Sequence, residues 1–111
     1  DKPIFKLIML PEADVFLESL APAVLRKVFY NIRKVAGGVK DSDLFKKLGD
    51  SGIWEFRTSW QGMAYRLFWD KDGETLVVAT HGLVKKTQKT PKSEIKHAQA
   101  IRKEYLETKD K

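Results

Sequence analysis

The sequence predicts an α+β fold, in which a small sheet carries two N-terminal helices on one face and is followed by a C-terminal helix. Three observations predict it: an apolar opening strand, two segments that begin with proline and have apolar residues at helical spacing, and three strand-like segments joined by turn signals. The expected order is β-α-α-β-β-β-α. Hydrophobic residues make up 42% of the 111 residues, so we expect one domain over residues 1–111, with residues 109–111 as a frayed tail.

The N-terminal third is expected to pass from a strand into two helices. Residues 4–10 are almost continuously apolar, which predicts a strand at the centre of the sheet. Pro11 and Pro22 suit the first turns of two helices, because a helix start leaves its amide hydrogens unbonded and proline has none. The first helix is expected to end near Ala21. In the second, the apolar residues at helical spacing are Leu25, Val28, Phe29, Ile32 and Val35, and Gly37-Gly38 ends it.

Three antiparallel strands are expected after a polar connection over residues 41–52. They cover residues 53–59, 63–69 and 74–80. The turns between them are predicted at Trp60-Gln61-Gly62 and at Asp70-Lys71-Asp72-Gly73.

Alternation in the second of these strands assigns the faces of the sheet. Tyr65, Leu67 and Trp69 share one face, and this bulkier face is expected beneath the two N-terminal helices. Arg66 is therefore expected on the reverse, open side. A final helix is expected to begin with Thr90 as its N-cap. Its apolar docking stripe consists of Ile95, Ala98, Ile101 and Tyr105.

Positive charge is concentrated towards the C-terminus. The formal charge of +6 divides into +3 for residues 1–40, −2 for residues 41–82 and +5 for residues 83–111. Such a field favours RNA, DNA or an acidic protein partner, and the alternative is an ordinary solvated surface. The chain lacks cysteine, a basic-then-apolar leader and any apolar run of the roughly 20 residues that span a membrane. We therefore expect a soluble cytoplasmic protein with no membrane contact.

The strand arginines are the first candidates for a phosphate site. Arg57 and Arg66 lie in mid-strand, where a half-buried guanidinium needs a partner or a ligand. The structural alternative is an ion pair with Glu55, Asp70 or Glu74. Arg66 is the better functional candidate, because packing residues flank it and its planar fork can hold a phosphate by two hydrogen bonds.

The second set of candidates follows the last strand. Lys85 and Lys86, with Gln88 and Lys89 beside them, form a basic segment in which packed cations can lower the pKa of one lysine enough for it to act as a base. His81 is a candidate for proton transfer near neutral pH, and the alternative is a structural histidine. The two histidines are not at metal-ligand spacing with carboxylates, so no metal and no cofactor is expected.

These segments resemble a known family, the HigB-like, phage-derived branch of the RelE/ParE toxin superfamily, over nearly the whole chain. The resemblance is carried by Leu44-Phe45-Lys46-Lys47-Leu48, Ile53-Trp54-Glu55-Phe56-Arg57, Tyr65-Arg66-Leu67-Phe68 and His81-Gly-Leu-Val-Lys-Lys-Thr-Gln-Lys-Thr-Pro91. It implies the toxin of a type II toxin–antitoxin pair, with a cognate antitoxin that carries a helix-turn-helix domain. It also implies a ribosome-dependent mRNA endoribonuclease that needs no metal, in which the ribose 2′-OH attacks the adjacent phosphate and leaves a 2′,3′-cyclic phosphate.

The resemblance also assigns roles to residues. Arg66 matches the arginine that stabilises the phosphate, Lys85 and Lys86 match the basic segment, and His81 is the proton-transfer candidate. The residues assigned to RNA or phosphate binding are Arg57, Lys46, Lys47, Gln88 and Lys89. The sequence departs from RelE-type enzymes where these place a catalytic Tyr or His near the C-terminus, because Lys86-Thr87-Gln88 stands there instead.

Two other functions are compatible with the same residues. One is a ParE-like inhibitor of DNA gyrase without nuclease chemistry, although the two strand arginines and the Lys85-Lys86 pair favour RNA. The other is a degenerate toxin whose basic face only binds an antitoxin.

Overall fold

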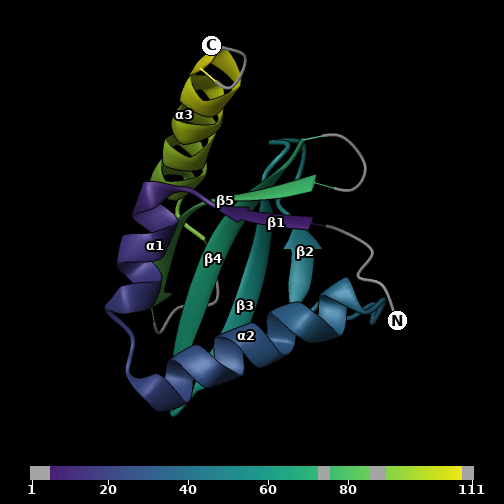
Figure 1. The fold of residues 1–111 in the computed structure, drawn as a ribbon, viewed down its shortest axis with the longest axis vertical. Coiled ribbons are helices and arrows are strands. Elements are labelled where there is room, and N and C mark those ends of the chain that lie inside the picture. Colours follow the sequence, from purple (N-terminus) through teal and green to yellow (C-terminus); the bar gives the residue numbers. More distant parts are fainter. Residues whose placement is uncertain (1–5, 73–75, 86–89, 109–111) are drawn as a thin grey trace.

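The computed structural model describes residues 6–72, 76–85 and 90–108. Two N-terminal helices cover one face of a five-stranded sheet, and a third helix starts on the other face and extends beyond the sheet (Figure 1). The predicted α+β class and the placement of the helices are confirmed. In the described part of the chain, no helix is both long enough and apolar enough to cross a membrane.

The sheet has the strand order β1-β5-β4-β3-β2. The strands are β1 (Lys6–Met9), β2 (Phe45–Lys47), β3 (Trp54–Trp60), β4 (Met63–Asp72) and β5 (Leu76–Lys85). The pair β1 and β5 is parallel, and the other neighbours are antiparallel. The three-stranded meander predicted from alternation is therefore present as β3, β4 and β5.

Three predictions about the strands were wrong. The opening strand lies at the edge of the sheet and not at its centre, although Leu7 and Met9 pack on the core. A short strand, β2, interrupts the predicted polar connection, and its Phe45 ring stacks on Trp54 with centroids 4.7 Å apart. Strand β5 continues to Lys85, so the segment from His81 to Lys85 belongs to the sheet and does not follow it.

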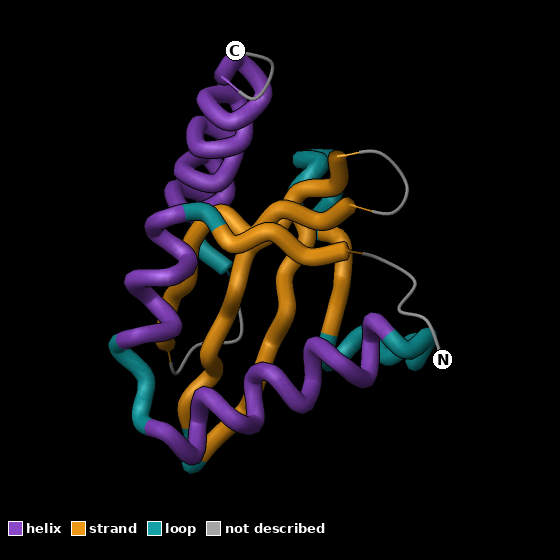
Figure 2. Tube along the Cα trace, in the orientation of Figure 1, coloured by secondary structure: helices purple, strands orange, loops and turns teal. Residues whose placement is uncertain are grey.

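The helices agree closely with the sequence pattern. Helix α1 (Pro11–Glu18) and helix α2 (Pro22–Ala36) each begin with proline and are joined by a short connection (Figure 2). Gly37 caps α2, and Gly38 adopts a φ of 103°, in the left-handed region that favours glycine. Helix α3 (Lys92–Thr108) buries only Ala98, and its C-terminal half stands clear of the sheet (Figure 1).

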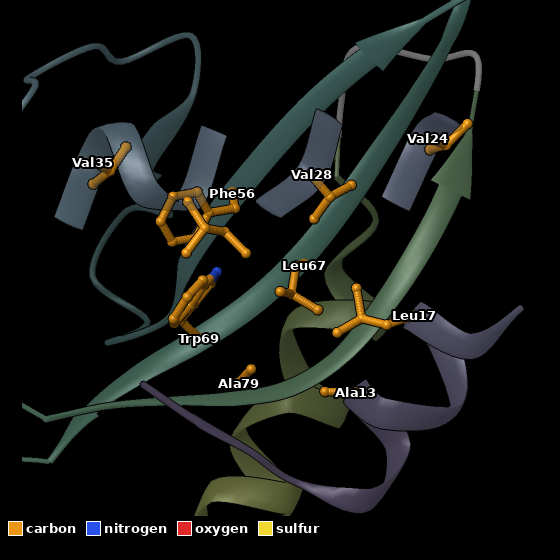
Figure 3. Close-up of a cluster of buried hydrophobic side chains, with 10 residues drawn as sticks. Ala13, Leu17, Val24, Val28, Val35, Phe56, Leu67, Trp69 and Ala79 are labelled. Carbon is orange, nitrogen blue, oxygen red and sulfur yellow. The ribbon is translucent and has the colours of Figure 1, made fainter. Parts of the chain in front are cut away.

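The core lies between the sheet and the two N-terminal helices. Leu67 and Trp69 from β4 and Phe56 from β3 meet apolar side chains of α1 and α2 (Figure 3). Trp69 is fully buried, and its ring lies 4.2 Å from that of Phe56. The predicted assignment of the bulkier face of β4 to the helices is confirmed.

The turn between β3 and β4 and an irregularity between β4 and β5 position the reverse face. Gln61 and Gly62 both have positive φ and form a two-residue turn within the predicted Trp60-Gln61-Gly62 connection, while Trp60 still belongs to β3. The turn predicted at Asp70-Lys71-Asp72-Gly73 was wrong for its first three residues, which continue β4 and pair with β5, and Gly73 lies outside the described residues. The register shifts between Leu67 and Trp69, so that Phe68 faces two residues of β5, Thr80 and His81, in place of one.

Candidate phosphate-binding site

The register brings four cations to the face of the sheet opposite α1 and α2. Lys46 pairs with Glu55, and Arg57 pairs directly with Arg66. Lys85 pairs with Ala64, two residues before Arg66 on β4. Directly paired residues of antiparallel strands share a face, so Lys46, Arg57, Arg66 and Lys85 form one row, which we call the cation row.

Lys47 does not belong to the cation row. It pairs with Trp54, whose ring lies on the α2 side of the sheet, and its own side chain is exposed. Sequence reasoning assigned Lys46 and Lys47 to the same role, but the period of two along β2 directs them to opposite faces. Three other candidates, Lys86, Gln88 and Lys89, lie outside the described residues.

Glu55 is the centre of the cation row. Its carboxylate accepts hydrogen bonds from Nε of Arg57 at 3.3 Å and from Nη2 of Arg57 at 3.2 Å. Nε of Arg66 lies 3.9 Å from the same Oε1 atom. The Thr90 hydroxyl donates to Oε2 of Glu55 and accepts from Nη1 of Arg66 at 3.0 Å. One carboxylate therefore joins two arginines and Thr90, which lies two residues before α3.

Arg66 lies on the predicted face, but that face is not open at this point. Its side chain has an exposed fraction of 0%, as has that of Glu55, whereas the Arg57 side chain is 17% exposed. Burial lowers the pKa of Arg66, Glu55 raises it, and Arg57 lowers it further. The expectation of an exposed Arg66 was wrong because the segment leading into α3 returns over this face and places Thr90 against the guanidinium.

The direct pairing of Arg57 with Arg66 is the main electrostatic feature of the row. Like charges directly opposite each other on neighbouring strands are unfavourable unless an anion lies between them. Glu55 supplies that anion within the chain. One carboxylate within the chain therefore holds both guanidinium groups of the pair.

His81 lies in a separate polar cluster beneath α3. Its ring is buried and stacks on Phe68 at 4.8 Å, and its Nε2 atom lies 3.2 Å from Oε2 of Glu94. The His97 ring meets it edge-on at 4.5 Å, and Nε2 of His97 lies 2.9 Å from Oε1 of Glu12. Burial lowers the pKa of His81, so the neutral ring is favoured near pH 7.

The position of His81 in the sheet separates it from Arg66. Leu83 is the cross-strand neighbour of Arg66, and His81 lies two residues before Leu83 on β5. Leu83 and Phe68 both belong to the small apolar cluster beneath α3. His81 is thus a histidine within β5 that α3 covers, not a histidine at a strand end as predicted.

Sequence reasoning named Glu55 as an ion-pair partner of the arginines, and the structure confirms this alternative. It missed the part that Thr90 takes in this site. Thr90 was expected to cap α3, but its hydroxyl is engaged by Glu55 and Arg66. Among the described residues, no group of three His, Asp or Glu side chains is placed to hold a metal ion.

Residues 15–103 match a family model described as "Phage derived protein Gp49-like". No protein of curated function matches the sequence at a significant level. The fold is similar to that of an arginine-to-alanine double mutant of the E. coli toxin RelE in the free state, with a TM-score of 0.62, 18% identity, and coverage of 90% of this chain and 97% of that one. It is also similar to a chain of the intact E. coli RelBE toxin–antitoxin complex, with a TM-score of 0.54, 16% identity, and coverage of 77% and 99%.

Proposed function

Since the chain belongs to the Gp49-like family of phage-derived proteins and has the fold of RelE, we propose that it is a toxin that cuts mRNA on the ribosome. Its partner is a cognate antitoxin, and the helix-turn-helix type is the one that the sequence resemblance implies. The similarity to a chain of the RelBE toxin–antitoxin complex supports an antitoxin partner. The fold supports this proposal, and the residues of the cation row supply the positive charge that the reaction at a phosphate needs.

The observation that carries the proposal is the directly paired Arg57 and Arg66 on the face opposite α1 and α2. Two guanidinium groups held in one register by adjacent strands offer a fixed field for the negative charge of a phosphorane. Lys85 and Lys46 extend this field along the same face. A site built on strands keeps its charges in place during the reaction, which is what electrostatic stabilisation of a transition state requires.

The reaction is an in-line displacement at phosphorus. The 2′-oxygen forms a bond to the phosphorus and gives its proton to a base, while the bond to the 5′-oxygen breaks and that oxygen takes a proton from an acid. Arg57, Arg66 and Lys85 neutralise the equatorial oxygens. Proton transfer is assigned to the Lys85-Lys86 pair, because the buried His81 lies beneath α3 in a cluster separate from the cation row. The products are a 2′,3′-cyclic phosphate and a free 5′-hydroxyl.

Access to Arg66 requires a small rearrangement of the segment before α3. In the free chain the Thr90 hydroxyl accepts the hydrogen bond that Nη1 of Arg66 donates, and the Glu55 carboxylate offsets the charge of the two arginines. When RNA binds, a phosphate oxygen replaces this hydroxyl as the acceptor for Arg66, because the phosphate oxygen carries more negative charge and forms the stronger hydrogen bond. Arg57 is partly exposed and makes the first contact. Lys46, Gln88 and Lys89 bind the flanking phosphates.

Inducible expression with and without the adjacent open reading frame tests the proposal, with mRNA 5′ ends mapped after induction. We expect translation to stop and new 5′ ends to arise within translated messages, and we expect the neighbouring gene product to prevent both. Arg66→Ala should abolish the cuts, whereas Lys103→Ala, which removes an exposed cation of α3, should leave them unchanged. Circular dichroism of each variant establishes that it is folded.

Two outcomes would contradict the proposal. Unchanged cleavage by a folded Arg66→Ala variant would remove this arginine from the site. Growth arrest with intact mRNA and a DNA-damage response would indicate a gyrase inhibitor with the same fold.

A further inference from the structure

A groove of about 650 Å³ lies on the side of the molecule opposite the cation row. It runs along helix α2 and ends at Trp60, the last residue of β3. The half-buried side chains of Leu25, Phe29 and Trp60 form its base and continue into the main core. This groove, which we call the α2 groove, takes no part in the chemistry proposed for the reverse face of the sheet.

The rim of the α2 groove is cationic. Arg26, Lys27 and Arg33 line it with exposed side chains, and none of the described residues that line it is acidic. Helix α2 itself contains four Lys or Arg residues and no Asp or Glu. The rim therefore carries an uncompensated positive charge around an apolar base.

Tyr30 is the large apolar side chain that the groove leaves in solvent, with an exposed fraction of 50%. The Nζ atoms of Lys27 and Lys34 lie 5.2 Å and 5.5 Å from the centre of its ring. Both ammonium groups are within the range of a cation–π contact, so they compete with a nucleotide base for the faces of the ring. An exposed tyrosine among cations is a common anchor of protein interfaces.

We propose that the α2 groove binds an acidic amphipathic helix of a partner protein. Apolar residues of such a helix at positions i, i+3, i+4 and i+7 would cover Leu25, Phe29 and Trp60, and its Asp or Glu residues would meet Arg26 and Arg33. Charge complementarity favours this occupant over a basic or neutral helix. RNA would pair with the rim but leave the apolar base without a partner, so the observations favour protein.

The identification of the partner as the antitoxin rests on the proposed function. The preference of the groove for an acidic amphipathic helix does not rest on it. The groove lies on the face opposite Arg66. An antitoxin segment seated there would hold the toxin without entering the catalytic face, and a different part of the antitoxin would have to act on that face.

Charge reversal on the rim tests the proposal. The variant Arg26→Glu/Arg33→Glu is compared with Lys40→Glu, which reverses an exposed cation beyond the end of α2. Binding of the neighbouring gene product is measured by calorimetry at low and moderate salt. We expect the double variant to bind at least about tenfold more weakly and with a smaller salt dependence, and we expect Lys40→Glu to bind like the natural chain.

A second measurement does not depend on the chain being a toxin. An amphipathic helical peptide with leucine on one face and glutamate on the other is titrated into the ¹⁵N-labelled full chain, and a peptide with lysine in place of glutamate serves as its control. We expect the glutamate peptide alone to shift the amide signals of Phe29, Tyr30 and Arg33 and the indole signal of Trp60. Failure of both peptides to shift these signals would overturn the groove assignment, even where the antitoxin binds.

Three further outcomes of these experiments also test the groove assignment. Antitoxin binding that is unchanged in the double variant would overturn the proposal. Loss of mRNA cleavage with retained antitoxin binding would identify the rim as an RNA surface and overturn it as well. If no adjacent gene product binds but the glutamate peptide does, the proposed function fails and the groove assignment stands.

Discussion

Replacement of Glu55 by glutamine is the most direct test of how the cation row is held together. The change keeps the size of the side chain and removes its charge. Arg66 would then remain fully buried beside Arg57, without the carboxylate that lies 3.9 Å from its Nε atom and also accepts from Thr90. The amide oxygen of glutamine can still accept one hydrogen bond, so the loss is electrostatic and leaves no cavity.

The expected cost is large for a single isosteric change. Breaking a buried ion pair by removal of one partner destabilises a protein by about 3–5 kcal/mol, and the retained amide places Glu55→Gln near the lower figure, about 3 kcal/mol. Total stabilities of about 5–15 kcal/mol are typical, so the variant loses a substantial part of its stability. At about 4 °C per kcal/mol, the midpoint of thermal unfolding falls by about 12 °C.

Thermal and urea unfolding, followed by circular dichroism, measure the effect. Glu12→Gln is the matched control, because it makes the same change in a contact with His97 whose two side chains are 55% and 46% exposed. Such surface pairs contribute about 0–1 kcal/mol, so the control should unfold within about 4 °C of the natural chain. A Glu55→Gln variant as stable as the Glu12→Gln control would refute the inference that this carboxylate balances the arginines.

A double-mutant cycle separates the pair from its surroundings. Arg66→Met alone leaves Glu55 buried with Arg57 as its remaining cation. The combination Glu55→Gln/Arg66→Met should cost at least about 1.5 kcal/mol less than the sum of the single changes, because neither charge is then left buried without the other. Additive costs would show that Glu55 and Arg66 do not interact.

Three further predictions concern other parts of the fold. Gly82→Ala places a Cβ atom 2.1 Å from the Phe16 ring of α1, so it should lower the free energy of unfolding, measured in urea, by about 1–3 kcal/mol. The loss should be smaller in a Phe16→Ala background, where the ring is absent. Equal losses in both backgrounds would contradict the clash. The lowered pKa of His81 means that the unfolded chain binds a proton more readily, so this residue contributes stability above about pH 6.5 that is lost as the pH falls towards the folded pKa. His81→Phe should therefore lose less stability than the natural chain between pH 7.5 and pH 5.5, and parallel pH profiles would contradict this. Arg57→Gln should slow mRNA cleavage in a translation extract by a factor of about 100. The variant should unfold near the temperature of the natural chain, because relief of the like-charge contact with Arg66 offsets the lost ion pair. Cleavage at the natural rate would remove Arg57 from the site.

Local chemistry predicted the elements whose signals lie within a short stretch of sequence. Pro11 and Pro22 mark the starts of α1 and α2, and Gln61-Gly62 marks the turn between β3 and β4. Alternation along β4 assigned Trp69 to the helix-covered face, and with it Arg66 to the reverse face. Each of these features depends on backbone geometry or on a period of two, and neither requires knowledge of distant residues.

Features that depend on contacts between distant segments were not predictable in the same way. The edge position of β1 depends on its parallel pairing with β5, about 70 residues later in the chain. Strand β2 has three residues, too few to show a period, and it exists because β3 offers a free edge for pairing. The bulge opposite Phe68 directs His81 towards α3, and no repeat in the sequence marks it.

The sequence by itself determined the class of fold, the face on which Arg57 and Arg66 lie and the resemblance to a toxin family, because these follow from residue type and spacing along single segments. Only the tertiary structure decided that Arg66 is covered, that Glu55 and Thr90 join it, and that His81 belongs to a separate cluster with Glu94 and His97. The physical reason is that burial and ion pairing are set by the segment before α3, which returns over the sheet 24 residues after Arg66. Nothing in the local pattern of β4 encodes that return.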